Sequence, residues 1–329
     1  MRSPRAAVLL ILAAAAPAAA VDFGRAAVGT AGSEFLLMDA SARGIAMGGA
    51  MAAVTDDAAS LYWNPAGLAQ IPRMSATFMH AQYAADITDD AGAYAARLND
   101  TSVLGAGVRY LDGGSIEQTD INGLAGGTFH PRSYVGEVGW GQSIYDLSDS
   151  EMDVAMGVAA RVIRTDLGLK TANGYAADFG VQSRFYASAL TYDVSAVIQN
   201  LGKGQKFDQV RDTLPTRIHL AGAVRPIKPL TLTGEIIAPI NNAPYGALGA
   251  EWELEIARDV KGSARAGFNS LTMESLGIAS TLSLGFGVKL TNLSFDYAFV
   301  PMGALGTATH RISLSFNLPA KISRRYRER

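Results

Sequence analysis

Catalysis in this chain would depend on histidine, carboxylate and hydroxyl side chains, because the sequence has no cysteine. The four histidines are His80, His130, His219 and His310. No two of them stand three or four residues apart and no HExxH string occurs, so no metal-site pattern is present. His310 and Ser313 fall on opposite faces of one expected strand, and GxSxG is absent. We therefore expect no enzyme activity, no metal site and no cofactor.

The Asp56-Asp57 pair is the second place where the residue types suggest chemistry, as an acid/base pair or a calcium site. A calcium loop alternates its oxygen ligands, and two adjacent acids lack that spacing. Both acids precede a short stretch, 58 to 62, that we expect to be helical. A carboxylate there accepts hydrogen bonds from free backbone N–H groups and faces the positive end of the helix. The pattern favours helix capping.

Most of the remaining chain consists of segments with two-residue alternation, each followed by a turn rich in Gly, Asp, Asn or Pro. In one example, Val154, Met156 and Val158 share a face opposite Ala155 and Gly157. Period two is typical of β-strands. The fourteen expected strands are 73–84, 90–99, 102–112, 132–144, 152–164, 174–186, 190–200, 215–225, 229–238, 245–255, 260–268, 277–290, 291–300 and 308–318.

An even number of strands, many longer than the strands of soluble sheets, indicates an outer-membrane β-barrel more than a soluble sandwich or propeller. Closure removes the edge strands, and the apolar strand faces then meet lipid. No apolar run after residue 20 reaches the length that a membrane-spanning helix needs. We predict an all-β fold, a 14-stranded antiparallel transmembrane β-barrel over residues 73–318.

The two ends of the chain differ in composition from the barrel. Arg2 and Arg5 precede an apolar run and small residues, which predicts a cleavable signal peptide at 1–20 and a bacterial outer-membrane location. The C-terminal tail, 319–329, has five basic residues against Glu328. We read it as a solvated terminus, with anionic lipid or partner contact as the alternative. A nucleic-acid partner is not expected, since no basic fold surrounds the tail.

Residues 21–72 contain the one stretch after the signal peptide that does not read as strand, and we interpret it as a hatch folded into the barrel lumen. Pro65 disfavours helical backbone at Asn64, so Asn64 becomes a turn residue whose side chain bonds backbone groups. Glycines in the hatch allow close approach to the wall. The GxG strings at 139–141 and 285–287 place two glycines on one strand face, which would leave lumenal space for it. The candidate hatch residues are Asp56, Asp57, Asn64, Pro65, Ala66, Gly67, Gly44, Gly48 and Gly49.

Two connections are longer than the others, 113–131 and 201–214. Long loops are usually functional or disordered. With both barrel termini in the periplasm, counting strands places both connections outside the cell. They are candidate contact loops, and plain surface disorder stays open as the alternative.

The string ARGIAMGGAMAAVTDDAASLYWNPAGL at 42–68 resembles the N-terminal region of the PorV/PorQ family of FadL-like outer-membrane proteins. Asn64-Pro65-Ala66 matches the hatch motif of the long-chain fatty acid transporter superfamily. Strings at 108–123, 197–207 and 296–316 are similar to the same family, so the resemblance covers nearly the whole mature chain.

The resemblance implies a fourteen-stranded barrel with an internal hatch, serving the type IX secretion system, where PorV attaches and shuttles cargo that carries a C-terminal sorting domain. We therefore expect a non-enzymatic protein that supports protein secretion or surface attachment by docking cargo or partner barrels, in contact with outer-membrane lipid. Distant FadL-like relatives move hydrophobic compounds inward. The alternative is accordingly a channel for hydrophobic small molecules, with a ligand in the lumen.

Overall fold

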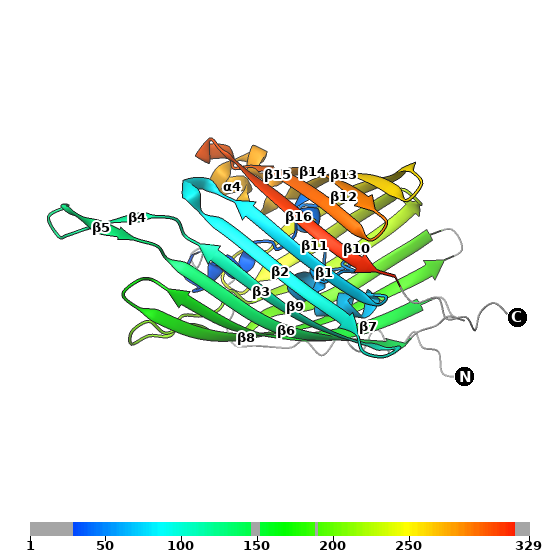
Figure 1. Ribbon diagram of the computed structural model, residues 1–329, viewed down its shortest axis with the longest axis horizontal. Coiled ribbons are helices and arrows are strands. Elements are labelled where there is room, and N and C mark those ends of the chain that lie inside the picture. The colour runs from blue at the N-terminus through cyan, green and yellow to red at the C-terminus, as the bar shows by residue number, and fades with distance from the viewer. Residues whose placement is uncertain (1–28, 146–151, 188–189, 320–329) are drawn as a thin grey trace, which may run out of the picture.

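The structure, a computed structural model, describes residues 29–145, 152–187 and 190–319. Fourteen antiparallel strands in these ranges form a closed barrel, in which β1 pairs with β16 (Figure 1). The barrel strands are β1 (Met74–Gln82), β2 (Thr88–Arg97), β3 (Ser102–Asp112), β6 (Arg132–Tyr145), β7 (Met152–Asp166), β8 (Thr171–Ala187), β9 (Leu190–Lys203), β10 (Arg217–Ile227), β11 (Leu230–Pro239), β12 (Tyr245–Ala257), β13 (Val260–Asn269), β14 (Leu282–Leu290), β15 (Leu293–Pro301) and β16 (Ala308–Leu318).

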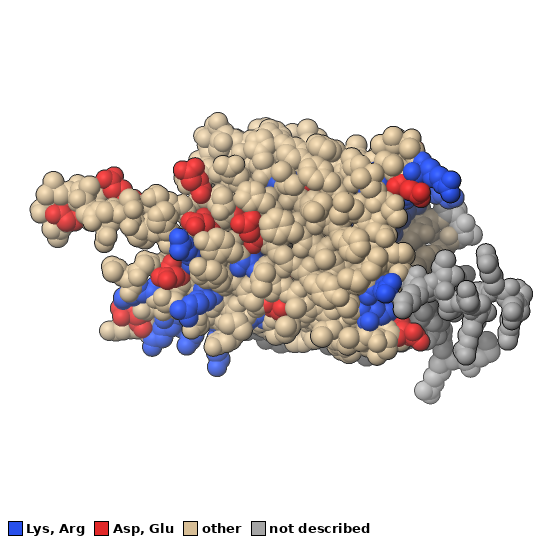
Figure 2. Space-filling model, viewed as in Figure 1, with Lys and Arg blue, Asp and Glu red and all other residues tan. Residues whose placement is uncertain are grey.

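Two-residue alternation decides which side chains face the lumen. In β7, Ala155, Gly157 and Arg161 are buried inside, whereas Met156 and Val158 are exposed outside. Small and charged residues therefore line the lumen and apolar residues cover the exterior, as expected for a barrel surrounded by lipid. Figure 2 shows the charged side chains on one face gathered at the two ends, with a broad band of other residues between them. No helix in the described ranges has the length and apolar character of a membrane span.

The two ends of the barrel differ in their connections. We call the end where β1 begins and β16 ends the terminal rim, and the opposite end the hairpin rim. Beyond the hairpin rim projects a two-stranded sheet made of β4 (Ile116–Thr119) and β5 (Ala125–Phe129) (Figure 1). Short 3-10 turns, η4 (Ala84–Asp86) and η7 (Gly303–Leu305), lie in other connections of this rim.

The prediction of a 14-stranded antiparallel barrel is confirmed, with two local corrections. The segment 113–131 is a hairpin and not a structureless loop. The strand expected from 277 begins at Leu282, because 270–281 forms η5 (Ser270–Thr272), α4 (Met273–Leu276) and η6 (Ile278–Thr281). The Ser280 and Thr281 hydroxyls bond the Gly277 and Ile278 carbonyls, and such local bonds compete with a strand ladder.

The chain before β1 runs through the lumen, where Figure 1 shows it enclosed by the strands. Its elements are η2 (Glu34–Leu37), α2 (Ala42–Ala46), α3 (Ser60–Trp63) and η3 (Pro65–Gln70). Helix α2 packs on β13 to β16, and η3 packs on β3, β6, β7 and β8. We call residues 29–73 the hatch. The predicted signal peptide, residues 21–28 and residues 320–329 lie outside the described residues.

Candidate functional site

The centre of the hatch is the corner at Asn64, between α3 and η3. Asn64 is fully buried and has extended backbone geometry, as expected before proline. Its Oδ1 accepts a hydrogen bond from Ala66 N at 3.0 Å, and its Nδ2 donates to the Ala52 carbonyl at 2.8 Å. Pro65 is the first residue of η3, a position where its missing N–H leaves no unpaired donor. The Asn64 side chain thus joins two parts of the hatch to each other.

The barrel wall is made of glycine where this corner touches it. A methyl group on Gly180 would lie 2.0 Å from Asn64 Oδ1, and one on Gly157 would lie 2.2 Å from the Pro65 carbonyl carbon. On Gly141 it would lie 2.7 Å from Ala69 N. Two other lumenal glycines follow the GxG spacing: a methyl would meet Leu61 at Gly139 and Ala46 at Gly285. Any side chain at these positions would push the hatch off the wall.

The hatch glycines have three different roles. Gly48 has a φ of +68° and lies against the wall, where a Cβ would be 2.5 Å from the Phe268 carbonyl oxygen. Gly44 instead approaches another part of the hatch, because a Cβ added to it would lie 2.2 Å from the indole of Trp63. Gly49 has ordinary space around it and a φ of +81°, so it supplies a turn that L-residues rarely adopt. A Cβ added to Gly67 would lie 2.6 Å from the Thr55 carbonyl oxygen, so Gly67 also packs against another part of the hatch.

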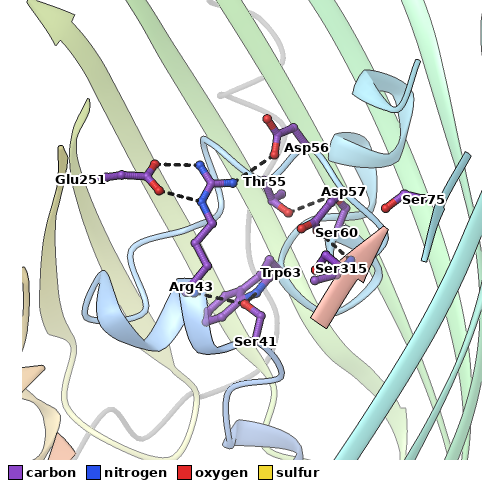
Figure 3. Close-up of polar contacts among 12 residues, drawn as sticks. Ser41, Arg43, Thr55, Asp56, Asp57, Ser60, Trp63, Ser75, Glu251 and Ser315 are labelled. Atoms are coloured by element: carbon purple, nitrogen blue, oxygen red, sulfur yellow. Dashed lines mark hydrogen bonds and ion pairs between the residues drawn. The ribbon is translucent and has the colours of Figure 1, made fainter. Parts of the chain in front are cut away.

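Asp56 and Asp57 have separate partners although they are adjacent. Asp57 Oδ1 accepts a hydrogen bond from Ala59 N at 2.9 Å, so it caps the turn that leads into α3. Asp56 does not cap this turn and accepts from Arg43 Nη1 at 3.1 Å (Figure 3). Burial and the neighbouring charge of Asp56 raise the pKa of Asp57 to about 6. The pair is thus a cap and an ion-pair partner.

Arg43 joins the hatch to the wall near the terminal rim. Its Nε and Nη2 donate to Glu251 of β12 at 3.1 and 2.9 Å, and Figure 3 shows the guanidinium between Glu251 and Asp56. Arg265 of β13 donates to the same carboxylate at 2.7 Å and to Asp296 of β15, also at 2.7 Å. Sequence reasoning missed Arg43, because nothing in the sequence pairs it with a carboxylate 208 residues away.

Wall side chains also satisfy backbone carbonyls of the hatch. Gln182 donates to the Ala53 carbonyl at 2.8 Å, and Gln199 donates to the Tyr62 and Trp63 carbonyls at 2.7 and 2.9 Å. An irregular segment inside a barrel needs such partners, since buried unpaired carbonyls are costly. These glutamines were also missed by sequence reasoning; the only signal is their inward place in an alternating strand.

The lumen contains buried ion pairs. Arg161 of β7 contacts Glu137 at 2.7 Å and Asp178 at 2.6 Å, and also donates to the Leu61 carbonyl of the hatch at 3.1 Å. In the hatch, burial raises the pKa of Asp39, although nearby arginines of the wall act in the opposite direction. The interior is therefore strongly polar and its charges are largely paired.

The histidines lie apart from one another. His80 and His310 are exposed on the outer face, where they bond Asp90 and Tyr297. His219 faces the lumen and bonds Glu235, and His130 is exposed beside β6. In the described part of the chain, no three His, Cys, Asp or Glu side chains are grouped as metal ligands would be.

The segment 201–214 is held at both of its ends and exposed in its middle. β9 continues to Lys203, and Gly204 after it is buried. Gln205 is buried, donating to the Ala172 carbonyl and accepting from Ser33 Oγ, and Leu214 packs with Phe35 of the hatch. This connection is therefore anchored to the hatch at Gln205 and Leu214, while Lys206 and residues 208–211 are exposed, so its role as a contact loop stays a prediction.

Comparison with known proteins gives one family and one fold. The model of the family described as "Type IX secretion system protein PorV" matches residues 22–228. No curated protein matches the chain. Among solved structures, the chain is similar to the Ralstonia pickettii toluene transporter TbuX, with 12% identity over 84% of this chain and 98% of that chain and a TM-score of 0.56.

Two further structures show the same likeness. The Pseudomonas putida toluene transporter TodX has 13% identity over 84% of this chain and 96% of that chain, with a TM-score of 0.52. A Pseudomonas aeruginosa FadL homologue has 11% identity over 84% and 98%, with a TM-score of 0.51. At such low identity the likeness shows a shared fold, a FadL-like barrel.

Proposed function

Because the chain belongs to the PorV family of type IX secretion system proteins, we propose that it docks secreted cargo or partner proteins at its hairpin rim. The family and the closed-barrel fold already give an outer-membrane barrel associated with type IX secretion. The docking role is our inference, and so is the placement of the hairpin rim outside the cell, which comes from counting strands.

The observation that carries the proposal is the β4–β5 hairpin. It projects past the rim, and its residues are exposed, including the apolar side chains of Ile121 and Leu124. In the described part of the chain β4 and β5 pair only with each other, so both outer edges present unpaired backbone groups. Such edges accept a further strand from a partner. An isolated two-stranded hairpin is at best marginally stable, and a docked partner would stabilise it.

The experiment replaces residues 114–130 by a two-residue Asn-Gly turn. Gly113 N already donates to the Pro131 carbonyl at 2.8 Å, so the shortened connection keeps a closed base. We expect the barrel to assemble, as judged by its shift in gel mobility on heating, and surface-attached cargo to fall to the level of a gene deletion. Unchanged surface proteins with a folded barrel would refute the docking role of the hairpin.

A point variant separates apolar contact from loop length. Ile121→Ser removes the apolar tip side chain, and Leu169→Ser is its control, because Leu169 is exposed on the β7–β8 turn of the same rim. We expect loss of cargo attachment in the first variant only. Equal effects of the two would mean that the rim contributes general surface and no specific contact.

The alternative function, a channel for hydrophobic small molecules, is favoured by the likeness of the fold to that of toluene transporters. It predicts that a gene deletion lowers uptake of an aromatic compound or a fatty acid while surface proteins stay unchanged. The hatch and the polar lumen argue for docking over this alternative, because an apolar solute would have to pass buried ion pairs such as Arg161 with Glu137.

A further inference from the structure

The two outer edges of the β4–β5 hairpin differ in their regularity. On β5, Gly126 is an extra residue without a partner on β4, since the pairing passes from Gly127 to Ala125. Gly127 has a φ of +131°, far from that of an ordinary strand. Such a β-bulge twists an edge away from further pairing. β4 contains no glycine, proline or bulged residue, so it is the edge on which a further strand can pair in register.

The backbone of Thr119 faces the free edge of β4. Asp120 N donates to the Leu124 carbonyl across the turn, so the backbone of Asp120 faces β5. Consecutive residues of a strand direct their N–H and C=O groups to opposite sides, and Thr119 therefore presents both groups outward. Counted through the paired residues, the same alternation places the N–H of Thr128 on the outer edge of β5.

The side chains around the β4 edge are acidic. Glu117 lies within β4 and Asp120 directly after it, and residues 114–130 contain no lysine or arginine. Figure 2 shows acidic and no basic side chains on the face drawn of the projecting hairpin. Asp86 of η4 lies beside the base of β4, where a methyl group on Gly114 would be 3.6 Å from the Asp86 carbonyl. None of these three carboxylates has an ion pair among the described residues.

Neighbouring cations do not offset this charge. Arg132, at the start of β6, is already paired with Asp112 at 3.6 Å. The cations on β7 and on the β7–β8 turn lie on the β5 side of the hairpin, because a methyl group on Gly168 of that turn would be 3.7 Å from Phe129 Cβ. The uncompensated negative charge therefore lies along β4.

We propose that β4 is the docking edge and that the partner protein supplies an extended, cationic strand, with a lysine or arginine opposite Glu117. This assignment rests on the docking role proposed above and adds the edge and the chemistry of the partner. Residues directly opposite each other on paired strands have Cβ atoms about 4.5–5.5 Å apart, so a basic side chain there reaches the carboxylate. Main-chain hydrogen bonds supply affinity, and the charge supplies specificity. A third strand also converts a marginal hairpin into a three-stranded sheet.

Two synthetic ten-residue peptides test the chemistry of the partner on the full-length protein in a non-ionic detergent. One alternates threonine with lysine and the other threonine with glutamate, so the pair differs mainly in charge. We expect the lysine peptide to bind at least about fivefold tighter at low salt, mostly through faster association. Salt at about 1 M, where the screening length is about 3 Å, should remove most of this preference.

Charge variants of the protein locate the preference. Glu117→Lys should remove it, because the carboxylate within the strand is replaced by a cation. Asp208→Lys is the matched control, since it makes the same change of charge at an exposed position of the same rim. The control should keep the preference of the unmodified protein.

Two proline variants test which edge is used. Thr119→Pro removes an outward N–H from β4, and Thr128→Pro removes one from β5, while both leave the bonds between the two strands in place. We expect loss of lysine-peptide binding and of surface-attached cargo in Thr119→Pro only. Thr119→Val keeps the N–H and should bind like the unmodified protein. All variants must show the heat-dependent gel shift of a folded barrel.

Other results would overturn the assignment. Equal binding of the two peptides, or of neither, would mean that the hairpin does not select a cationic strand, and so would a preference that survives Glu117→Lys. Loss of binding in Thr128→Pro, alone or together with Thr119→Pro, would mean that β4 is not the single docking edge. The docking role itself fails if replacing residues 114–130 leaves surface proteins unchanged. If that replacement abolishes attachment and Thr119→Pro does not, only the assignment to β4 is wrong.

Discussion

Gly157→Ala tests how tightly the hatch is seated. Gly157 faces the lumen from β7, where a methyl group would lie 2.2 Å from the Pro65 carbonyl carbon and 2.3 Å from Ala66 N. Ordinary contact begins at 3.4 Å, so the hatch and the strand must separate by the difference, 1.2 Å. β7 is paired along its length with β6 and β8. The hatch, and not the strand, is therefore the part that moves.

The cost of such overpacking is about 1–3 kcal/mol. If all of it acts on hatch docking, the ratio of seated to displaced hatch falls roughly 5- to 150-fold. Amide hydrogen exchange of η3 measures this ratio, because Gly67 N and Ile71 N, bonded to the Asn64 and Leu68 carbonyls, are buried while the hatch is seated and reach water when it is displaced. We expect exchange in these amides to accelerate by that factor.

Gly136→Ala is the matched control. Gly136 lies in β6, next to β7, but faces outward, and a methyl group there would have no atom within 4 Å. Exchange of η3 should stay at the wild-type rate in this variant. Wild-type exchange of η3 in Gly157→Ala as well would refute the argument that glycine is required where the wall meets the hatch. The heat-dependent gel shift of both variants shows whether the barrel has assembled.

Three further predictions concern buried polar groups. Asn64→Ala leaves the Ala52 carbonyl and Ala66 N unpaired, which costs about 1–3 kcal/mol for each group. Hydrogen exchange of the hatch should therefore accelerate, whereas the control Asn99→Ala, at an exposed position, should leave the exchange rate unchanged. Arg161→Gln leaves two buried carboxylates without their cation, which costs about 3–5 kcal/mol. The denaturant midpoint of unfolding should fall, whereas the control Arg164→Gln, on the outward face of the same strand, should not change that midpoint. The pKa of Asp57 is raised to about 6 from 3.8, so the folded state binds the proton more tightly and hatch stability should fall as pH rises from about 4 to 6, then level off; Asp57→Asn should abolish this slope in melting curves.

The barrel could be predicted from the sequence because alternation and strand length are local signals. β3 and β16 lie at their predicted bounds, and the GxG spacing around Gly139 and Gly285 marked lumenal space that the hatch fills. The segment 277–281 misled the prediction because its apolar residues suit a strand, while the hydroxyls of Ser280 and Thr281 bond nearby carbonyls. Hydropathy does not carry that information.

The partners of the hatch could not be predicted, because they come from strands far away in the sequence. Arg43 meets Glu251 across 208 residues, and Gln182 meets the Ala53 carbonyl across 129. An inward charged or amide residue on a strand is visible in the alternation, but which hatch atom it bonds depends on the closed barrel. The different roles of Asp56 and Asp57 could not be predicted for a similar reason. Asp56 pairs with Arg43, a residue outside the local helix-capping pattern, and only Asp57 caps the turn.

The distribution of these bonds also separates the two candidate functions. The hatch is bonded to strands all round the barrel, and the bonds join Ala42 N to Ser313 of β16, Ala58 N to Ser75 of β1, Ala52 N to Glu235 of β11, the Gly48 carbonyl to Asn269 of β13, the Ala53 carbonyl to Gln182 of β8 and the Leu61 carbonyl to Arg161 of β7. Each contributes about 0.5–1.5 kcal/mol net, so moving the whole hatch breaks all of them together. A solute can pass through the lumen only if at least some of these bonds are broken. Docking at the hairpin rim leaves every one of these bonds intact, and this difference favours a protein that works at its rim.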